Sequence, residues 1–178
     1  MKFRDIKQTT QAKYHVDAPW EYFEDHYLAY RNGVHALDLD LDPDYQRDYC
    51  WTEEQKRRYI EWVLKGGTSG KEIYLNHPGW MKSFKGKFEV VDGKQRISAV
   101  LDFLHDKIKV FGKYYSEFED SLPLSNASFS VNIADLTSRR EILQWYLDMN
   151  SCGVAHTNSE IENVRKLIEE EQRNEGEV

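Results

Sequence analysis

Cysteine is scarce in this sequence. Cys50 and Cys152 are the only two among 178 residues, and they form no Cys-x-x-Cys pair. A disulfide framework or a thiolate zinc site needs more cysteines at closer spacing. The six histidines likewise lack the His-x-x-x-His and Glu-x-x-His spacings of metal sites. We therefore interpret both cysteines as ordinary thiols, and we expect no metal site built from histidines.

Long apolar runs are also missing. Residues 97–104 form one of the longest, and Ser98 and Asp102 interrupt it, whereas a membrane span requires about 20 apolar residues. The first residues carry charge, but no apolar stretch typical of a secretory signal follows them. We therefore expect a cytoplasmic protein that does not span a membrane.

Two familiar catalytic motifs are absent as well. The chain has no Gly-x-x-x-x-Gly-Lys-Thr loop and no Gly-x-Ser-x-Gly elbow, so nothing supports P-loop or α/β-hydrolase chemistry. What is present is 40% apolar and 31% charged residues, a balance typical of a protein with a packed core. The length of 178 residues fits a single domain. We expect residues 1–13 and 172–178 to be flexible ends.

Negative charge dominates overall, but positive charge is concentrated in one stretch. The net charge is −7, which disfavours a generic nucleic-acid coat because such proteins neutralise phosphates. Residues 17–49 carry nine acids against two arginines, a net −7, whereas residues 82–113 carry eight Lys or Arg against four acids, a net +4. A local positive field of this kind can attract an anion. The alternative is a solvated, lysine-rich face.

Short strands and helices alternate along the chain. Leu37, Leu39 and Leu41 alternate with aspartates, as in a half-buried strand. The segment Thr52-Glu53-Glu54-Gln55 has the pattern of a capping box at a helix start. Together the patterns predict an α/β (α+β) fold with helices at 17–31, 52–66, 97–104, 137–150 and from 157, strands at 37–41, 72–76, 88–91 and 128–133, and a hairpin at 107–115.

The turn after the strand at 88–91 carries the most informative residues, Asp92-Gly93-Lys94-Gln95-Arg96. Apolar residues follow at helical spacing at positions 97, 100, 101 and 104, so the turn lies at a helix N-terminus. Unpaired backbone N–H groups and the positive end of the helix dipole make such a terminus a natural phosphate site.

Each residue of the turn has a chemistry suited to phosphate. Gly93 lets the backbone approach closely, while Lys94 and Arg96 add positive charge where it is unfavourable for the helix alone. Arg96 can grip phosphate with its planar guanidinium, Gln95 can orient a water or a ribose hydroxyl, and Asp92 can hold a magnesium ion. The alternative is that Asp92 merely caps the helix and the basic side chains are exposed.

A second polar cluster, residues 43–51, lies between the predicted strand at 37–41 and the next helix. It reads Pro-x-Tyr-Gln-Arg-x-Tyr-x-Trp, and it is followed along the chain by Val-Val-Asp-Gly-Lys-Gln-Arg-Ile-Ser-Ala-Val, then by Asn150-Ser151-Cys152-Gly153 and Glu160. These motifs, in this order over residues 37–165, resemble the N-terminal domain of GmrSD-type restriction systems. The resemblance implies a ParB/sulfiredoxin-like fold, a small mixed sheet with flanking helices.

The resemblance also implies nucleotide binding and hydrolysis, centred in the family on an Asp-Gly-Gln-Gln-Arg motif. Lys94 departs from the family glutamine inside that motif, where it can change base preference or hydrolysis itself. Carried over residue by residue, the resemblance points to catalytic Asp92, Gln95 and Arg96, to phosphate-binding Gln46, Arg47, Gly93, Lys94 and Arg96, and to Asp92 as the Mg²⁺ ligand.

Aromatic residues near these motifs have two different expected places. Trp51 lies beside Gln46 and Arg47 and can wall the pocket or stack on a base. Trp145 and Tyr146, in the helix predicted at 137–150, are expected in the core.

The leading hypothesis is a stand-alone domain that binds a nucleoside triphosphate with Mg²⁺ and hydrolyses or senses it. The family's restriction proteins continue into a nuclease domain, which we expect this chain to lack, so a separate nuclease or restriction subunit is an expected partner. Two alternatives stay open. One is a ParB-like DNA nickase or nuclease, and the other is a non-catalytic phage or mobile-element interaction module.

Overall fold

A mixed four-stranded sheet organises the chain. The computed structural model describes residues 13–28, 37–80, 82–151 and 158–176. Its sheet has the strand order β1-β4-β2-β3, and β4 pairs antiparallel with β1 and parallel with β2, while β3 pairs antiparallel with β2. The strands are β1 (Tyr14–Pro19), β2 (Glu72–Asn76), β3 (Glu89–Asp92) and β4 (Ser128–Ala134). The predicted small mixed sheet with flanking helices is confirmed.

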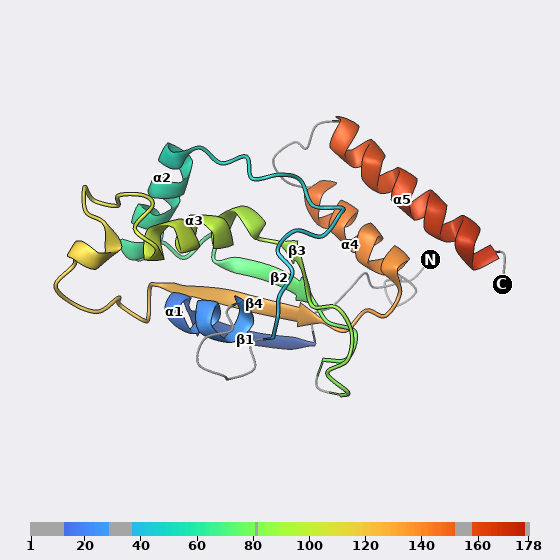
Figure 1. The fold of residues 1–178 in the computed structure, drawn as a ribbon, viewed down its shortest axis with the longest axis horizontal. Helices are drawn as coiled ribbons and strands as arrows, with labels where there is room; N and C mark the ends of the chain where they lie inside the picture. Colours follow the sequence, from blue (N-terminus) through green and yellow to red (C-terminus); the bar gives the residue numbers. More distant parts are fainter. Residues whose placement is uncertain (1–12, 29–36, 81, 152–157, 177–178) are drawn as a thin grey trace, which may run out of the picture.

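The four longer helices lie in two groups, while the short α1 lies against β1 and β4 (Figure 1). In one, α2 and α3 pack together; in the other, α4 packs against β3 and along α5. The helical segments are α1 (Trp20–Phe23), which continues into the π-helical η2 (Glu24–Leu28), α2 (Glu53–Leu64), α3 (Lys94–Leu104), the 3₁₀ turn η3 (Tyr115–Glu117), α4 (Arg139–Ser151) and α5 (Asn158–Gly176). Among the described residues, no helix is both long and apolar enough to cross a membrane.

Two apolar clusters flank β3. Val90 belongs to the larger cluster, which includes side chains of β1, β2, β4 and α3, whereas Val91 belongs to a smaller cluster with α4 and α5. Because successive side chains of a strand point to opposite faces, β3 contributes to both clusters. Asp92, the last residue of β3, therefore emerges at the boundary between the two helix groups. Trp145 and Tyr146 are buried in the smaller cluster, as predicted.

Several predicted elements are confirmed closely. The strand at 72–76 is β2, and the strands at 88–91 and 128–133 are β3 and β4 with ends shifted by one residue. The capping box is present at the start of α2: the Thr52 hydroxyl accepts from the Gln55 N–H at 3.2 Å, and Gln55 Oε1 accepts from the Thr52 N–H at 2.8 Å. Local sequence signals were sufficient for these elements.

Three predicted elements are wrong. Residues 14–19 form β1, so the first helix begins at Trp20 rather than at 17, because β4 offers a partner strand to this segment. Residues 37–41 are not a strand: Asp38 has a φ of 53°, which breaks the extended chain, and only Asp40 forms a bridge, with Glu89. The hairpin at 107–115 reduces to a single bridge between Val110 and Lys113.

Some predictions lie outside the described residues. These are the end of the first helix at Arg31, the cap at Gly153, the capping box that begins at Thr157, and Cys152. Of the predicted flexible ends, residues 172–176 continue α5, Lys13 precedes β1, and the rest is also outside the described part.

Candidate functional site

The turn from β3 into α3 depends on a glycine. Gly93 has a φ of 112°, and a Cβ placed on it would lie 2.5 Å from Cγ2 of Ile73 on β2. Other residues avoid this φ and cannot occupy that space, so the sheet can pass this closely under the turn only with glycine here. Gly93 is also the N-cap of α3 and accepts from the Ile97 N–H at 2.9 Å. Gly93 has no side chain with which to cap α3, and no side-chain hydrogen bond to the first N–H groups of α3 is found within the described residues.

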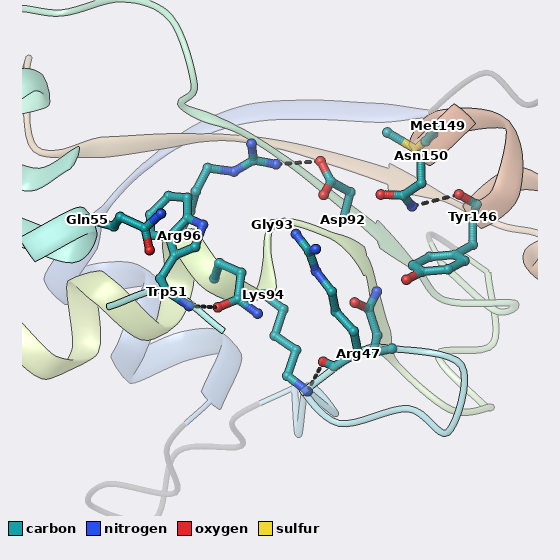
Figure 2. A pocket seen from close by; sticks show the side chains of 12 residues that line it. Arg47, Trp51, Gln55, Asp92, Gly93, Lys94, Arg96, Tyr146, Met149 and Asn150 are labelled. Carbon is teal, nitrogen blue, oxygen red and sulfur yellow. Dashed lines mark hydrogen bonds and ion pairs between the residues drawn. The ribbon is translucent and has the colours of Figure 1, made fainter. Parts of the chain in front are cut away.

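A cavity of about 350 Å³ opens at this turn. Its lining includes all of the predicted site residues, Gln46, Arg47, Asp92, Gly93, Lys94, Gln95 and Arg96, which come from two distant parts of the sequence. The remaining lining residues are Trp51, Gln55, Tyr146, Met149 and Asn150. The structure therefore gathers the predicted residues around one cavity, between the start of α3, the loop before α2 and the end of α4 (Figure 2).

Asp92 and Arg96 form an ion pair on the cavity wall. Nη2 of Arg96 donates to Oδ2 of Asp92, one helical turn away. Nε of Arg96 is buried and has no hydrogen-bond partner within the described part of the chain. Arg96 thus keeps an unused donor, while Asp92 fixes the direction of its guanidinium. Both side chains are partly exposed to the cavity.

Arg47 reaches into the same cavity from the loop before α2. Figure 2 shows its side chain extending toward Gly93 and the start of α3. Its backbone carbonyl accepts from Nζ of Lys94 at 2.9 Å, but its guanidinium makes no hydrogen bond or ion pair with any residue that the structure describes. An unpaired arginine therefore lies beside an uncapped helix N-terminus.

Lys94 points to the loop. Its ammonium is 2.6 Å from Oδ1 of Asp42, donates to the Arg47 carbonyl and lies 4.4 Å from the centre of the Tyr49 ring. The side chain is only 5% exposed. Its charge is thus already compensated within the protein. Phosphate binding by Lys94 stays a prediction, and the geometry gives this residue a structural contact in addition.

The two glutamines of the site also bind backbone groups. Gln95 accepts at Oε1 from the N–H groups of Cys50 and Trp51, at 3.0 and 3.2 Å, and donates from Nε2 to the Asp48 carbonyl at 2.9 Å. Gln46 donates from Nε2 to the carbonyls of Val90 and Val91, at 3.1 and 2.7 Å. Both amides therefore attach the loop to the strand-turn-helix unit.

One carboxylate, Asp92, belongs to the cavity lining. Within the described ranges, no group of three or more His, Cys, Asp or Glu side chains is arranged to hold a metal ion. Magnesium is commonly bound by one or two carboxylates together with phosphate oxygens and water. The residues present therefore fit a magnesium ion that arrives with a phosphorylated ligand, and they do not form a complete protein site for one.

The end of α4 closes the far side of the cavity. Asn150 donates from Nδ2 to the Tyr146 carbonyl at 2.7 Å and lies across from Asp92 in Figure 2. The Asn-x-x-Gly motif of the sequence includes Asn150, so a signal for this residue existed. Met149 and Tyr146 reach the cavity through the packing of α4, and no sequence motif marks Met149 as part of the site.

The fold and the cavity define a small α/β domain with a polar site at a strand-to-helix turn. The sequence matches the family described as "GmrSD restriction endonuclease, N-terminal domain" over residues 27–175. The chain belongs to this family, which confirms the resemblance carried by its motifs, and it is a restriction-system domain of that N-terminal type. No curated protein and no solved structure gives a significant match to it.

Proposed function

We propose that the cavity binds a nucleoside triphosphate and that the domain hydrolyses it with Mg²⁺. The observation that carries this proposal is the unpaired guanidinium of Arg47 beside the uncapped start of α3. Membership of a restriction-system family agrees with it, because that family's motif implies nucleotide chemistry. The volume of about 350 Å³ lies within the usual range of small-molecule sites.

In this proposal each group of the cavity has a role that follows from its position. The first N–H groups of α3 and the guanidinium groups of Arg47 and Arg96, two residues of the cavity lining, would hold phosphate oxygens. Asp92 would hold Mg²⁺, whose other ligands would be phosphate oxygens and water. The ion would neutralise charge on the phosphates, and Arg96 would stabilise the charge that develops on the transferring phosphoryl group.

Phosphate release from ATP, GTP, CTP and UTP with Mg²⁺ tests the proposal. We expect Arg96→Ala to lower kcat about 10³-fold, by analogy with arginine fingers, and Arg47→Ala to raise KM with a smaller effect on kcat. Arg57→Ala is the matched control, because Arg57 lies exposed on α2 and outside the cavity lining. It should behave as the native chain does.

Folded native protein that releases no phosphate from any of the four nucleotides would contradict hydrolysis. Nucleotide binding without release would leave a sensing role. Plasmid nicking that requires Mg²⁺ and disappears in Asp92→Ala would support the nickase alternative instead. Turnover that survives Arg47→Ala with unchanged KM would remove Arg47 from the site.

A further inference from the structure

The middle residues of the turn, Lys94 and Gln95, line the cavity, but the polar ends of their side chains contact the loop before α2. We call residues 42–51 the site loop, because this segment carries Arg47 and Trp51 to the cavity. Lys94 and Gln95 together make five polar contacts with it, to Asp42, Arg47, Asp48, Cys50 and Trp51. The site loop contains no helix or strand, and besides Lys94 and Gln95 the amide of Gln46 attaches it to β3.

The contacts of Gln95 fix the orientation of its amide group. Two backbone N–H groups, of Cys50 and Trp51, point at one atom, which must be the oxygen, and a backbone carbonyl, of Asp48, faces the other, which must be the nitrogen. The residue is 8% exposed. An amide oxygen that accepts two N–H donors has both lone pairs in use, so it is poorly suited to orient an attacking water.

Lys94 contacts Arg47 and nearby residues of the site loop. Its ammonium bridges the Arg47 carbonyl and the Asp42 carboxylate, at 2.9 and 2.6 Å, and lies against the Tyr49 ring. Lys94 therefore contacts Arg47 itself and two further residues of the site loop, Asp42 before Arg47 and Tyr49 after it. The Lys94 side chain is buried, whereas Asp42 is 64% exposed, so solvent reaches the Asp42 side of this ion pair.

We propose that Lys94 and Gln95 are positioning residues, which hold the site loop so that Arg47 and Trp51 face the cavity. This inference rests on the proposed function, since its consequence is measured through nucleotide binding. It changes the role of Gln95 from water orientation to loop attachment. It also gives a role to Lys94, which stands where the family has glutamine: its long side chain carries an ammonium group to Asp42 and to the Arg47 carbonyl.

A double-mutant cycle between Gln95→Ala and Arg47→Ala distinguishes the two roles. If Gln95 acts through the loop, Gln95→Ala raises KM about tenfold in the native background, leaves kcat within about threefold, and adds at most about twofold in the Arg47→Ala background. If Gln95 orients the attacking water, kcat falls by the same factor in both backgrounds. That second result would overturn the inference.

Lys94→Met supplies an independent variant, because it keeps a long apolar stem and removes the ammonium. Its KM should rise, and the rise should shrink in the Arg47→Ala background. Lys85→Met is the control, since Lys85 is exposed and lies outside the cavity lining. Gln95→Glu keeps an oxygen acceptor for the Cys50 and Trp51 N–H groups but loses the donor to the Asp48 carbonyl, so its KM should lie between those of the native chain and Gln95→Ala. A Glu variant no better than Ala would contradict the assigned contacts.

Amide hydrogen exchange separates failure of this inference from failure of the proposed function. The N–H groups of Cys50 and Trp51 should lose protection in Gln95→Ala, with or without nucleotide. Lost protection in a chain that binds no nucleotide would overturn the proposed function, and with it the role assigned in binding, while the loop attachment would stand. Unchanged protection would overturn the loop attachment, whatever the native chain does with nucleotides.

Discussion

Two helix N-termini line the same cavity and are built in opposite ways. The start of α2 is self-sufficient: Thr52 and Gln55 form a capping box, and Glu53 and Glu54 lie in the first turn, where negative charge is favourable. The start of α3 has glycine as its N-cap, no side-chain cap and no acidic residue in its first turn. The contrast teaches that neither a side-chain cap nor an acidic first turn neutralises the start of α3 among the described residues, and this agrees with the proposed phosphate site.

The two cations near the start of α3, Lys94 and Arg47, differ in the same way, since one is paired within the protein and the other is not. Lys94 is buried and paired with Asp42, whereas Arg47 is only partly buried and its guanidinium has no partner in the described part of the chain. A basic residue in a motif therefore does not reveal by itself which anion it meets. The predictions below test the comparison from the largest expected effect to the smallest.

Replacing Gly93 should have the largest effect. Gly93→Ala places a Cβ 2.5 Å from Cγ2 of Ile73 at a φ of 112°, and we expect a loss of about 3 kcal/mol or more of unfolding free energy from overpacking and backbone strain. Gly112→Ala is the control, because Gly112 also has a positive φ, 79°, but no atom within 4 Å of its added Cβ. It should cost about 1 to 2 kcal/mol. Equal losses in urea unfolding would contradict the close-packing argument.

Replacing the paired cation, Lys94, should destabilise the protein more than replacing the unpaired cation, Arg47. Lys94→Ala removes charged hydrogen bonds from a buried position, and we expect it to cost about 2 kcal/mol. Arg47→Ala removes a guanidinium that has no hydrogen-bond or ion-pair partner in the described ranges, so it should change stability by less than about 0.5 kcal/mol. Denaturant unfolding without nucleotide measures both. A larger loss in Arg47→Ala than in Lys94→Ala would reverse the comparison.

A substitution at the N-cap of α2 should lower the stability of the protein and leave nucleotide affinity unchanged. Thr52→Ala removes the N-cap of α2 and should cost about 1 kcal/mol. Nucleotide affinity should stay within about twofold of native, because Thr52 is outside the cavity lining. Thermal unfolding and a nucleotide titration of the same preparation measure the two effects. A strong loss of affinity would show that α2 takes part in binding.

Glu89, at the opposite end of β3 from Asp92, provides a carboxyl whose environment is set by packing. It is 3% exposed, and burial raises its pKa above the usual 4.5. The folded chain then holds this proton more tightly than the unfolded chain, so the contribution of Glu89 to stability falls as pH rises from about 4.5 through the raised value. Glu89→Gln should be more stable than native at pH 8, by about 1 kcal/mol, and the difference should shrink at pH 4. A difference independent of pH would contradict this.

The turn at which the cavity opens could be predicted from the sequence, because its signals are local. An apolar strand end, Asp-Gly and helical apolar spacing place the turn, and the resemblance brings Arg47 to it. The directions of Lys94 and Gln95 could not be predicted, because they depend on the path of the site loop. The strand β1 was missed for a similar reason, since its partner β4 lies more than 100 residues further along the chain.

The central claim is that Arg47 and the start of α3 form a nucleotide phosphate site. Calorimetric titration of the native chain with each nucleoside triphosphate and Mg²⁺ tests it most directly, beside Arg47→Ala and the control Arg57→Ala. The account predicts binding by the native chain and by Arg57→Ala, and affinity at least about tenfold weaker in Arg47→Ala. Equal affinities in all three proteins, or no binding by the folded native chain, would contradict it.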